Sequence, residues 1–165
     1  MKKQIWMCAI AAMSAFAVQG ASAQGSLPLS LEARIDAGLP VGDSGDVFKS
    51  GVGFELDGIL HLTPMFGLYG GYSRYEFGLE GFDNEDSEAE GGQLGGRITL
   101  GTGGAVWTPY AQVGAVFVDG ETGFEGGLGA FYPVGGNLSV TPMARYRNVD
   151  DIQYVTLGVG LNMRL

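Results

Sequence analysis

The chain of 165 residues carries 18 acidic and nine basic side chains, and 30 of its residues are glycine. This acidic balance argues against a nucleic acid partner, because phosphate binding needs a basic face. A hydrophobic fraction of 45% excludes a disordered chain, which would lack the apolar residues that build a core. The composition therefore favours one folded, glycine-rich domain.

The first residues have the pattern of a secretory signal peptide. Two lysines precede the apolar run Ile5–Val18, and Ala21–Ala23 form a cleavage site of the Ala-x-Ala type. The run has about 14 residues, and a membrane-spanning helix needs roughly 20, so cleavage is favoured over anchoring. We predict a signal peptide over residues 1–23 and one domain over residues 24–165. The only cysteine, Cys8, lies in the signal peptide, which leaves the domain without a disulfide or a cysteine metal site.

Apolar and polar residues alternate in eight segments of the domain. A period of two indicates a strand with one apolar and one polar face. The third segment is rich in tyrosine and glycine and does not separate into two faces, so we predict a bulge near Gly70–Gly71. The eight segments are 29–39, 52–62, 66–77, 93–100, 111–117, 124–132, 138–147 and 153–165.

The eighth segment has the clearest pattern. From Val155 to Leu165 every second residue is apolar, and the alternation continues without a break to the last residue. About eleven residues is the length that crosses a bilayer as a tilted strand. We therefore interpret this segment as the closing strand of an outer-membrane barrel.

The connectors between the segments alternate in kind. Three are short and nearly uncharged, and four carry most of the remaining charge. Outer-membrane barrels have short periplasmic turns and longer extracellular loops, so we expect both termini in the periplasm and the charged connectors outside. The uncharged connectors are 63–65, 101–105 and 133–136, and the charged ones are 41–50, 78–90, 119–123 and 148–152.

The charged residues within the segments lie on the polar face, which must point inward. An arginine or lysine facing lipid at the midplane costs about 2–4 kcal/mol, whereas charges inside a narrow eight-stranded lumen can pair. A soluble sandwich is the alternative, but the strand lengths and the alternating connectors favour closure. The predicted lumenal charge network comprises Glu32, Arg34, Asp36, Glu55, Asp57, Arg97, Glu125, Arg145 and Arg164.

Glycines and aromatic residues complete the predicted barrel. Glycines on the polar faces would make room for the long arginine and glutamate side chains. Aromatic residues gather near both ends of the segments, which is typical of two interfacial girdles. The glycines are Gly95, Gly114, Gly127, Gly129, Gly158 and Gly160. The aromatic residues are Phe66, Trp107 and Tyr132 near the uncharged connectors, and Phe54, Phe117, Phe124 and Tyr146 near the charged ones.

Several stretches carry a resemblance to a known group. They are the signal peptide, Phe66–Tyr75, Thr108–Gly114, Leu138–Arg147 and the closing strand. In these features the chain resembles the small eight-stranded outer-membrane barrel proteins, which include outer-membrane proteins A, X and W and the opacity proteins. The resemblance implies an all-β fold, namely an eight-stranded antiparallel up-and-down transmembrane β-barrel in the cell outer membrane.

The same resemblance implies partners for the closing strand and for the barrel. Gly160, Met163 and Leu165 resemble the C-terminal signal that the barrel assembly machinery reads, although the group usually ends in Phe. The expected partners are this machinery during insertion, and outer-membrane lipid and lipopolysaccharide afterwards. We expect a monomer.

Residues suited to chemistry are few. His61, the only histidine, lies at the uncharged-connector end of its segment, whereas a lipid A-modifying enzyme would work at the outer leaflet. The acidic connector 78–90 offers carboxylates for Ca²⁺ or Mg²⁺ but lacks the EF-hand pattern, and a run of like charge is usually solvated. We therefore predict no catalytic residue, no metal site and no cofactor.

The sequence favours a structural or surface-interaction role, in envelope stability or adhesion. The first alternative is a small passive channel for hydrophobic or minor solutes, and the second is a lipid A-modifying enzyme. Because the predicted lumen is filled by charged side chains, we expect little conductance.

Overall fold

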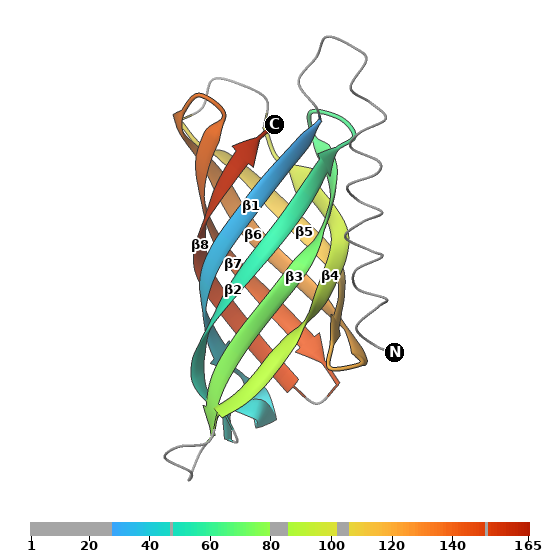
Figure 1. Ribbon diagram of the computed structural model, residues 1–165, viewed down its shortest axis with the longest axis vertical. Helices are drawn as coiled ribbons and strands as arrows, with labels where there is room; N and C mark the ends of the chain where they lie inside the picture. Colours follow the sequence, from blue (N-terminus) through green and yellow to red (C-terminus); the bar gives the residue numbers. More distant parts are fainter. Residues whose placement is uncertain (1–27, 47, 80–85, 102–105, 151) are drawn as a thin grey trace.

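The computed structural model is a closed, all-antiparallel barrel of eight strands (Figure 1), which confirms the predicted fold. The structure describes residues 28–46, 48–79, 86–101, 106–150 and 152–165; the predicted signal peptide lies outside these ranges. A short 3-10 helix, η1 (Gly42–Asp46), follows the first strand. The strands are β1 (Leu29–Pro40), β2 (Phe48–His61), β3 (Phe66–Leu79), β4 (Asp86–Thr99), β5 (Thr108–Val118), β6 (Glu121–Gly135), β7 (Leu138–Val149) and β8 (Ile152–Arg164).

Each strand pairs with its neighbours in sequence, and β1 pairs with β8 to close the sheet. The closing register sets Leu31 against Met163 and Pro40 against Tyr154. β1 therefore begins, and β8 ends, at the same end of the barrel, which is the upper end in Figure 1. We call this end the terminal end, and we call the other the acidic end because its connectors, 41–47, 80–85, 119–120 and 150–151, contain eight acidic residues and no basic one.

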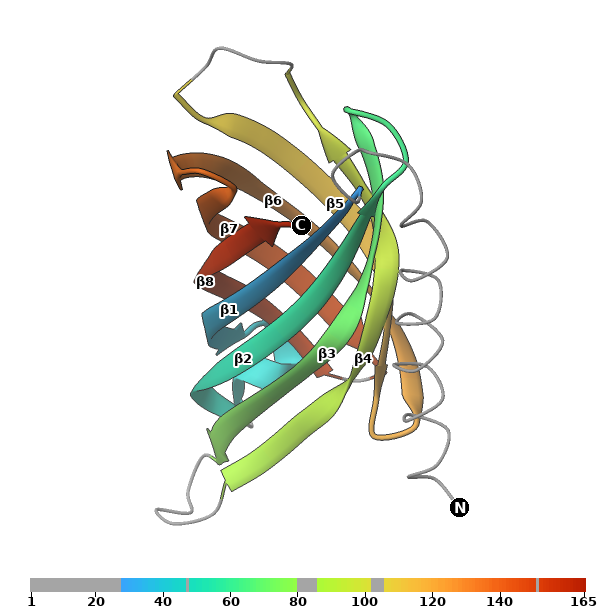
Figure 2. The ribbon, with the colours of Figure 1, turned by 45° about the horizontal axis from the view of Figure 1, so that its top comes forward.

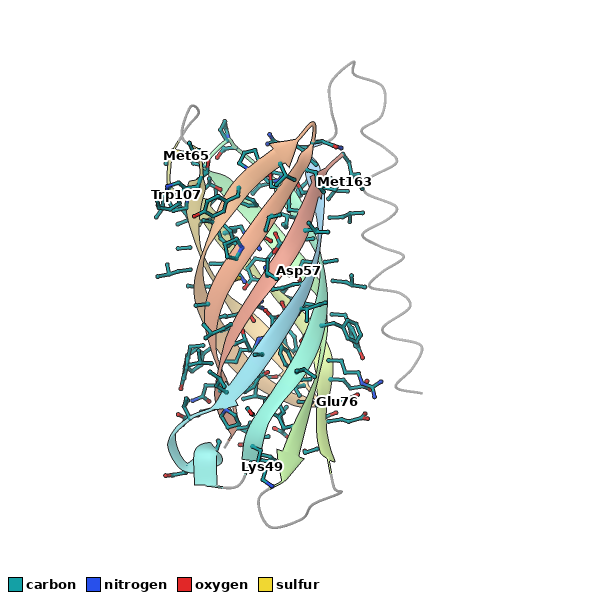
Figure 3. The ribbon with its side chains drawn as sticks, turned by 90° about the vertical axis from the view of Figure 1, so that its left-hand side faces the viewer. Lys49, Asp57, Met65, Glu76, Trp107 and Met163 are labelled. Atoms are coloured by element: carbon teal, nitrogen blue, oxygen red, sulfur yellow. The ribbon has the colours of Figure 1, made fainter. Side chains whose placement is uncertain are left out.

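The alternation of the sequence separates the two faces of the wall. Ile35, Val113 and Leu128 are 66 to 71% exposed on the outer surface. By contrast, Glu32 and Arg34 of β1 and Glu125 of β6 are buried inside the barrel. Figure 3 shows Asp57 within the barrel, Met65, Trp107 and Met163 toward the terminal end, and Lys49 and Glu76 toward the acidic end.

Aromatic pairs mark both ends of the apolar outer surface. At the terminal end the rings of Trp107 and Tyr132 stack with centroids 6.3 Å apart. At the acidic end the rings of Phe124 and Tyr146 lie 6.0 Å apart. The predicted girdles therefore correspond to two belts, the positions that amphipathic rings prefer at membrane interfaces.

The predicted bulge near Gly70–Gly71 is wrong. The ladder between β2 and β3 runs through Gly70 and Gly71 without a shift, and its irregularity lies between Phe48 and Gly51. Gly71 has a packing role instead, because a Cβ atom there would lie 2.3 Å from Oδ1 of Asp57. Tyr69, Gly71, Ser73, Tyr75 and Phe77 form the inward face of β3, which the sequence pattern left unassigned.

The charged connectors are shorter than predicted. β3 continues to Leu79 and β4 begins at Asp86, so the predicted connector 78–90 shrinks to residues 80–85, which lie outside the described residues. β5 and β6 are joined by Asp119 and Gly120 alone, with φ angles of 52° and 96°, as in the type I′ turns that favour Asp-Gly. The contrast in connector charge persists, but the predicted contrast in length does not, because 100–107 at the terminal end is the longest connector.

Candidate functional site in the barrel lumen

Side chains from all eight strands meet in the middle of the lumen. Five carboxylates and four guanidinium groups are buried there among tyrosine and amide side chains. We call this set the lumenal network. It consists of Glu32, Arg34, Asp36, Glu55, Asp57, Tyr69, Ser73, Tyr75, Gln93, Arg97, Gln112, Glu125, Arg145, Arg147 and Asn162.

Glu55 of β2 is the most heavily bonded carboxylate of the network. Its Oε2 accepts hydrogen bonds from Arg34 at 3.1 Å and from Arg145. Its Oε1 lies 2.7 Å from a guanidinium nitrogen of Arg147 and 2.6 Å from the hydroxyl of Tyr75. Because β2 and β7 are three strands apart around the wall, the bonds to Arg145 and Arg147 cross the lumen.

Glu125 of β6 binds the same two arginines of β7. Its Oε2 lies 3.0 Å from Arg145 and 2.8 Å from Nε of Arg147, and its Oε1 accepts a hydrogen bond of 2.5 Å from Tyr69. Arg147 also donates to Ser73 at 3.1 Å on β3, the strand opposite β7. Arg145 and Arg147 thus tie both sides of the barrel to one cluster of charge.

Arg97 of β4 anchors the part of the network nearer the terminal end. It donates to Glu32 at 3.1 Å across the lumen and to Gln112 at 2.8 Å on the adjacent strand. Its guanidinium carbon lies 4.3 Å from the ring centre of Tyr110, within the range of a cation–π interaction. Glu32 also accepts from Arg34 and from Asn162, so its carboxylate is fully engaged.

Asp36 and Asp57 have hydrogen bonds but no ion pair within the described residues. Asp36 accepts from Tyr75 at 2.9 Å, and Asp57 accepts from Gln93 at 2.7 Å. The backbone makes space for them at glycines: a Cβ at Gly158 would lie 1.7 Å from Oδ1 of Asp36, just as one at Gly71 would meet Asp57. The arrangement has one more carboxylate than guanidinium groups.

Other side chains lie on either side of the charges. Toward the acidic end, Tyr75 and Phe77 join five other buried apolar residues in one cluster: Ala89, Val116, Val118, Val149 and Tyr154. Toward the terminal end, Ser30 and His61 form a hydrogen bond of 2.8 Å. Because the network joins opposite walls, the middle of the lumen is filled by side chains instead of forming an open bore (Figure 2 shows the strand wall around it).

The structure brings together eight of the nine predicted network residues. The prediction for the ninth, Arg164, is wrong, because this side chain lies outside the lumen. Arg164 is exposed at the last position of β8, beyond the packed lumen, and its backbone nitrogen donates to Asn137 at 2.9 Å. Arg147, which the predicted network omits, is completely buried. It shares a face with Arg145, and that alternation was the signal that could have identified it.

The predicted role of the lumenal glycines is also corrected. The closest side chain is a tyrosine at Gly95, Gly114 and Gly129, and it is a methionine, an aspartate and a threonine at Gly127, Gly158 and Gly160. A Cβ at Gly129 would lie 2.4 Å from the ring of Tyr110, and one at Gly114 would lie 2.4 Å from the hydroxyl of Tyr69. Three of the six glycines therefore accommodate tyrosine, and none has an arginine or glutamate as its closest neighbour.

The predicted assembly signal occupies both faces of the closing strand. Gly160 is buried on the lumenal side, where a Cβ would lie 2.7 Å from Oγ1 of Thr141. Met163 and Leu165 are exposed at the terminal end, and the backbone nitrogen of Leu165 donates to Leu29 at 2.9 Å. The last residue is thus held in the seam between β8 and β1.

Groups suited to catalysis or metal binding are scarce in the described part of the chain. Ser30 is a hydroxyl partner for His61 that sequence reasoning missed, yet within the described residues no carboxylate forms an ion pair with the ring. No group of three potential metal ligands occurs in those ranges. No described helix is long and apolar enough to cross a membrane.

Comparisons with known proteins agree on the fold. Residues 8–164 match the family described as outer membrane protein beta-barrel domain. Neisserial surface protein A has a TM-score of 0.67 at 15% identity, covering 86% of this chain and all of its own. The attachment invasion locus protein Ail of Yersinia pestis scores 0.58 at 16% identity, covering 83% and 97%.

A third solved structure, the N-terminal β-barrel domain of Pseudomonas aeruginosa OprF, scores 0.56 at 18% identity and covers 85% of this chain and all of its own. No curated protein sequence matches the chain significantly. These identities show a shared fold, whereas the family match spans nearly the whole sequence. The chain therefore belongs to the outer membrane protein β-barrel domain family and is a protein of the cell outer membrane.

Proposed function

We propose that the protein is a non-enzymatic structural and surface-interaction component of the outer membrane. The observation that supports this most strongly is the lumenal network, which joins all eight strands through bonds across the lumen. Ion pairs in a poorly solvated interior attract strongly, so they hold the opposing walls together. A barrel built in this way suits a rigid membrane anchor better than a conduit.

The acidic end is the proposed contact surface. Its connectors carry only acidic charge, and on the outer face of the adjoining strands Arg74 is held by Glu88 at 2.7 Å and Glu76 at 3.4 Å. Since extracellular loops usually carry the charge and variety of such barrels, we assign this end to the cell exterior and both termini to the periplasm. The apolar outer surface contacts lipid, and the acidic end contacts lipopolysaccharide.

The negative charge of the acidic end indicates which kind of partner it would bind. Ail of Yersinia pestis has been crystallised in complex with sucrose octasulfate, a heparin analogue. The acidic connectors of the present chain would repel a sulfated polyanion, so we propose partners with cationic surfaces. The barrel assembly machinery is the proposed partner during insertion, with the protein a monomer afterwards.

A deletion strain tests this function. We expect deletion to increase detergent sensitivity and to reduce binding to cationic surfaces while leaving small-solute uptake unchanged. Complementation with a variant carrying Asp43→Asn, Asp119→Asn and Asp150→Asn should restore detergent resistance but not surface binding, because these exposed positions accept the isosteric amide. A strain that changed only in solute uptake would contradict the proposal and favour the passive channel.

A further inference from the structure

β4 extends further at the acidic end than β5, its neighbour in the barrel wall. The ladder between the two strands ends where Gly91 faces Val118, because β5 turns back into β6 at Asp119 and Gly120. β4 remains paired with β3 as far as Asp86. The first residues of β4 therefore have a neighbouring strand on one side only, and Figure 2 shows this end of β4 projecting beyond the turn between β5 and β6.

The backbone of this segment directs its hydrogen-bonding groups to alternate sides. The amide of Asp119 donates to the carbonyl oxygen of Glu90 at 3.2 Å, so the groups of Glu90 point toward β5. Because successive residues of a strand point these groups in opposite directions, those of Glu88 and Asp86 point the same way, and those of Ala89 point to β3. Within the described residues, no strand pairs with Glu88 or Asp86 on the side away from β3. We call Asp86–Ala89 the free edge.

The free edge lies beyond the hydrocarbon region of the membrane. Glu76, Glu88 and Glu90 are exposed on the outer surface of the hairpin that β3 and β4 form, together with Arg74. Charged side chains that face acyl chains are costly, and such residues are rare there. This part of the hairpin therefore lies in the aqueous layer, where a partner can reach the edge of β4.

We propose that the free edge binds an extended, basic segment of a partner protein, which adds to β4 as an antiparallel strand. An unpaired edge offers N–H and C=O groups to any chain that can run beside it, and strand addition satisfies them. A partner residue opposite Glu88 would exchange two backbone hydrogen bonds with it, and both side chains would point to the outer surface. The inference deepens the proposed interaction with cationic surfaces, and it rests on the acidic end being extracellular.

The described side chains beside the free edge select a basic partner. The carboxylate of Glu88 is exposed at the edge, and those of Glu90 and Asp119 are exposed next to it. Arg74 pairs with Glu88 and Glu76, so these five side chains keep a net negative charge. A lysine or arginine opposite Glu88 would gain a cross-strand ion pair. A second copy of this chain would place like charges there, which disfavours pairing between two free edges.

Alternate residues of the added strand would face the interior. On that side Ala89 is buried in the apolar cluster, so a charged residue beside it would lose its hydration without a partner. The segment that fits the free edge therefore alternates basic residues, which face outward, with uncharged residues, which face inward.

Titration of the purified barrel in uncharged maltoside micelles tests the proposal with three peptides of alternating lysine and threonine. One peptide is unmodified, one is N-methylated on the backbone of its lysines, and one on the backbone of its threonines. All three carry the same charge, but only the lysine amides point to β4 when the lysine side chains face outward. We expect lysine methylation to weaken binding at least about tenfold, the loss of two hydrogen bonds, and threonine methylation to have little effect.

The outcomes separate strand addition from simple charge attraction. Equal binding of the three peptides would refute strand addition and leave the proposed attraction to cationic surfaces intact. Stronger weakening by threonine methylation, or no binding of any peptide at millimolar concentrations, would also overturn strand addition. The structural role is judged separately, by the deletion strain.

Amide hydrogen exchange locates the peptide on the barrel. In the protein alone, the amide of Glu88 should exchange with solvent much faster than that of Ala89, because only Ala89 is bonded to β3. A saturating concentration of the unmodified peptide should slow exchange at Glu88 at least about tenfold and leave Ala89 unchanged. An amide of Glu88 that is protected without peptide, or that is unaffected by peptide, would refute the free edge.

Two substitutions at Glu88 separate its backbone from its charge. Glu88→Gln removes the charge and should weaken binding of the unmodified peptide about two- to fivefold. Glu88→Pro also removes the N–H group on the free side, where a strand tolerates proline, and should weaken binding further. Glu76→Gln, the same change on β3 and away from the edge, is the matched control and should have a smaller effect.

Folding of every variant is verified by its heat-dependent mobility on gels. Equal binding to folded Glu88→Pro and Glu88→Gln, or equal weakening by Glu76→Gln, would refute the assignment. If Glu88→Pro fails to fold, hydrogen exchange at Glu88 in the unmodified protein gives the decisive result.

Discussion

Removing Arg145 from the lumen should lower the stability of the barrel substantially. Its guanidinium group is completely buried and bonds to Glu55 and, at 3.0 Å, to Glu125. Removing one partner of a buried ion pair costs about 3–5 kcal/mol, because a charge remains without its counterion. Both carboxylates keep Arg147, at 2.7 and 2.8 Å, so we expect Arg145→Met to lower the free energy of unfolding by about 3 kcal/mol, at the lower end of that range.

Reversible unfolding in phospholipid vesicles measures this change. Urea titration followed by the fluorescence of Trp107, the only tryptophan outside the predicted signal peptide, should show the midpoint decreasing by roughly 1–3 M, given slopes of about 1–3 kcal/mol/M. Leu157→Val is the matched control on the lipid face. It should cost less than about 1 kcal/mol, because lipid fills the space that one methylene leaves.

A second substitution tests whether charge is the cause. Arg145→Met leaves five carboxylates facing three guanidinium groups, and adding Glu125→Gln removes one carboxylate while keeping an acceptor for Arg147. The double variant should therefore be more stable than the single one. If the double variant is less stable, or if Leu157→Val costs more than Arg145→Met, the assignment of inward and outward faces or the energetic role of the network is wrong.

Four further predictions follow from the geometry. The folded protein should migrate differently on gels before and after boiling, because a closed barrel satisfies its backbone internally; identical mobility would contradict closure. Planar bilayers should show at most small, intermittent conductance that increases in Arg97→Ala, whereas large steady currents in the unmodified protein would refute a filled lumen. Gly91→Ala should destabilise the barrel because the added Cβ would lie 1.8 Å from a backbone oxygen of Phe117, whereas Gly126→Ala, on the open outer face, should not. Replacing residues 80–85 with Asn-Gly should leave heat-dependent mobility intact, and loss of assembly would show that this connector is needed for folding.

The alternation of the sequence predicted which side of the wall a residue faces, but not how far along the barrel it lies. An alternation with a period of two determines which side of the wall each residue faces, so Glu55, Arg97 and Arg145 could be assigned to the lumen from the sequence. Depth depends on strand tilt and register, which alternation does not encode. This explains both errors in the network, since Arg147 lies deep enough to be enclosed and Arg164 lies at the rim.

Strand ends and the third strand were harder to predict for two other reasons. Acidic residues such as Glu88 normally indicate a loop, yet here the paired strands continue past the apolar belt and Glu88 binds Arg74 on their outer surface. In β3, aromatic residues occur on both faces: Tyr72 points outward and Tyr75 inward. A tyrosine can face lipid or a polar lumen equally well, so hydrophobicity alone could not assign the strand.

The inward aromatic residues also explain why a chain so rich in glycine encloses a filled lumen. Each of several inward rings pairs directly with a glycine on the neighbouring strand: Tyr69 with Gly95, Tyr75 with Gly53, and Tyr110 with Gly129. A side chain at any of these glycines would collide with its partner, because a Cβ at Gly53 would lie 2.2 Å from the ring of Tyr75. The glycines thus let the rings lie against the wall, where hydroxyl groups of Tyr69 and Tyr75 reach Glu125 and Glu55. At these positions, a glycine on the polar face of a strand indicates a large side chain on the neighbouring strand. Counting every such glycine as empty space therefore overestimates the width of the lumen.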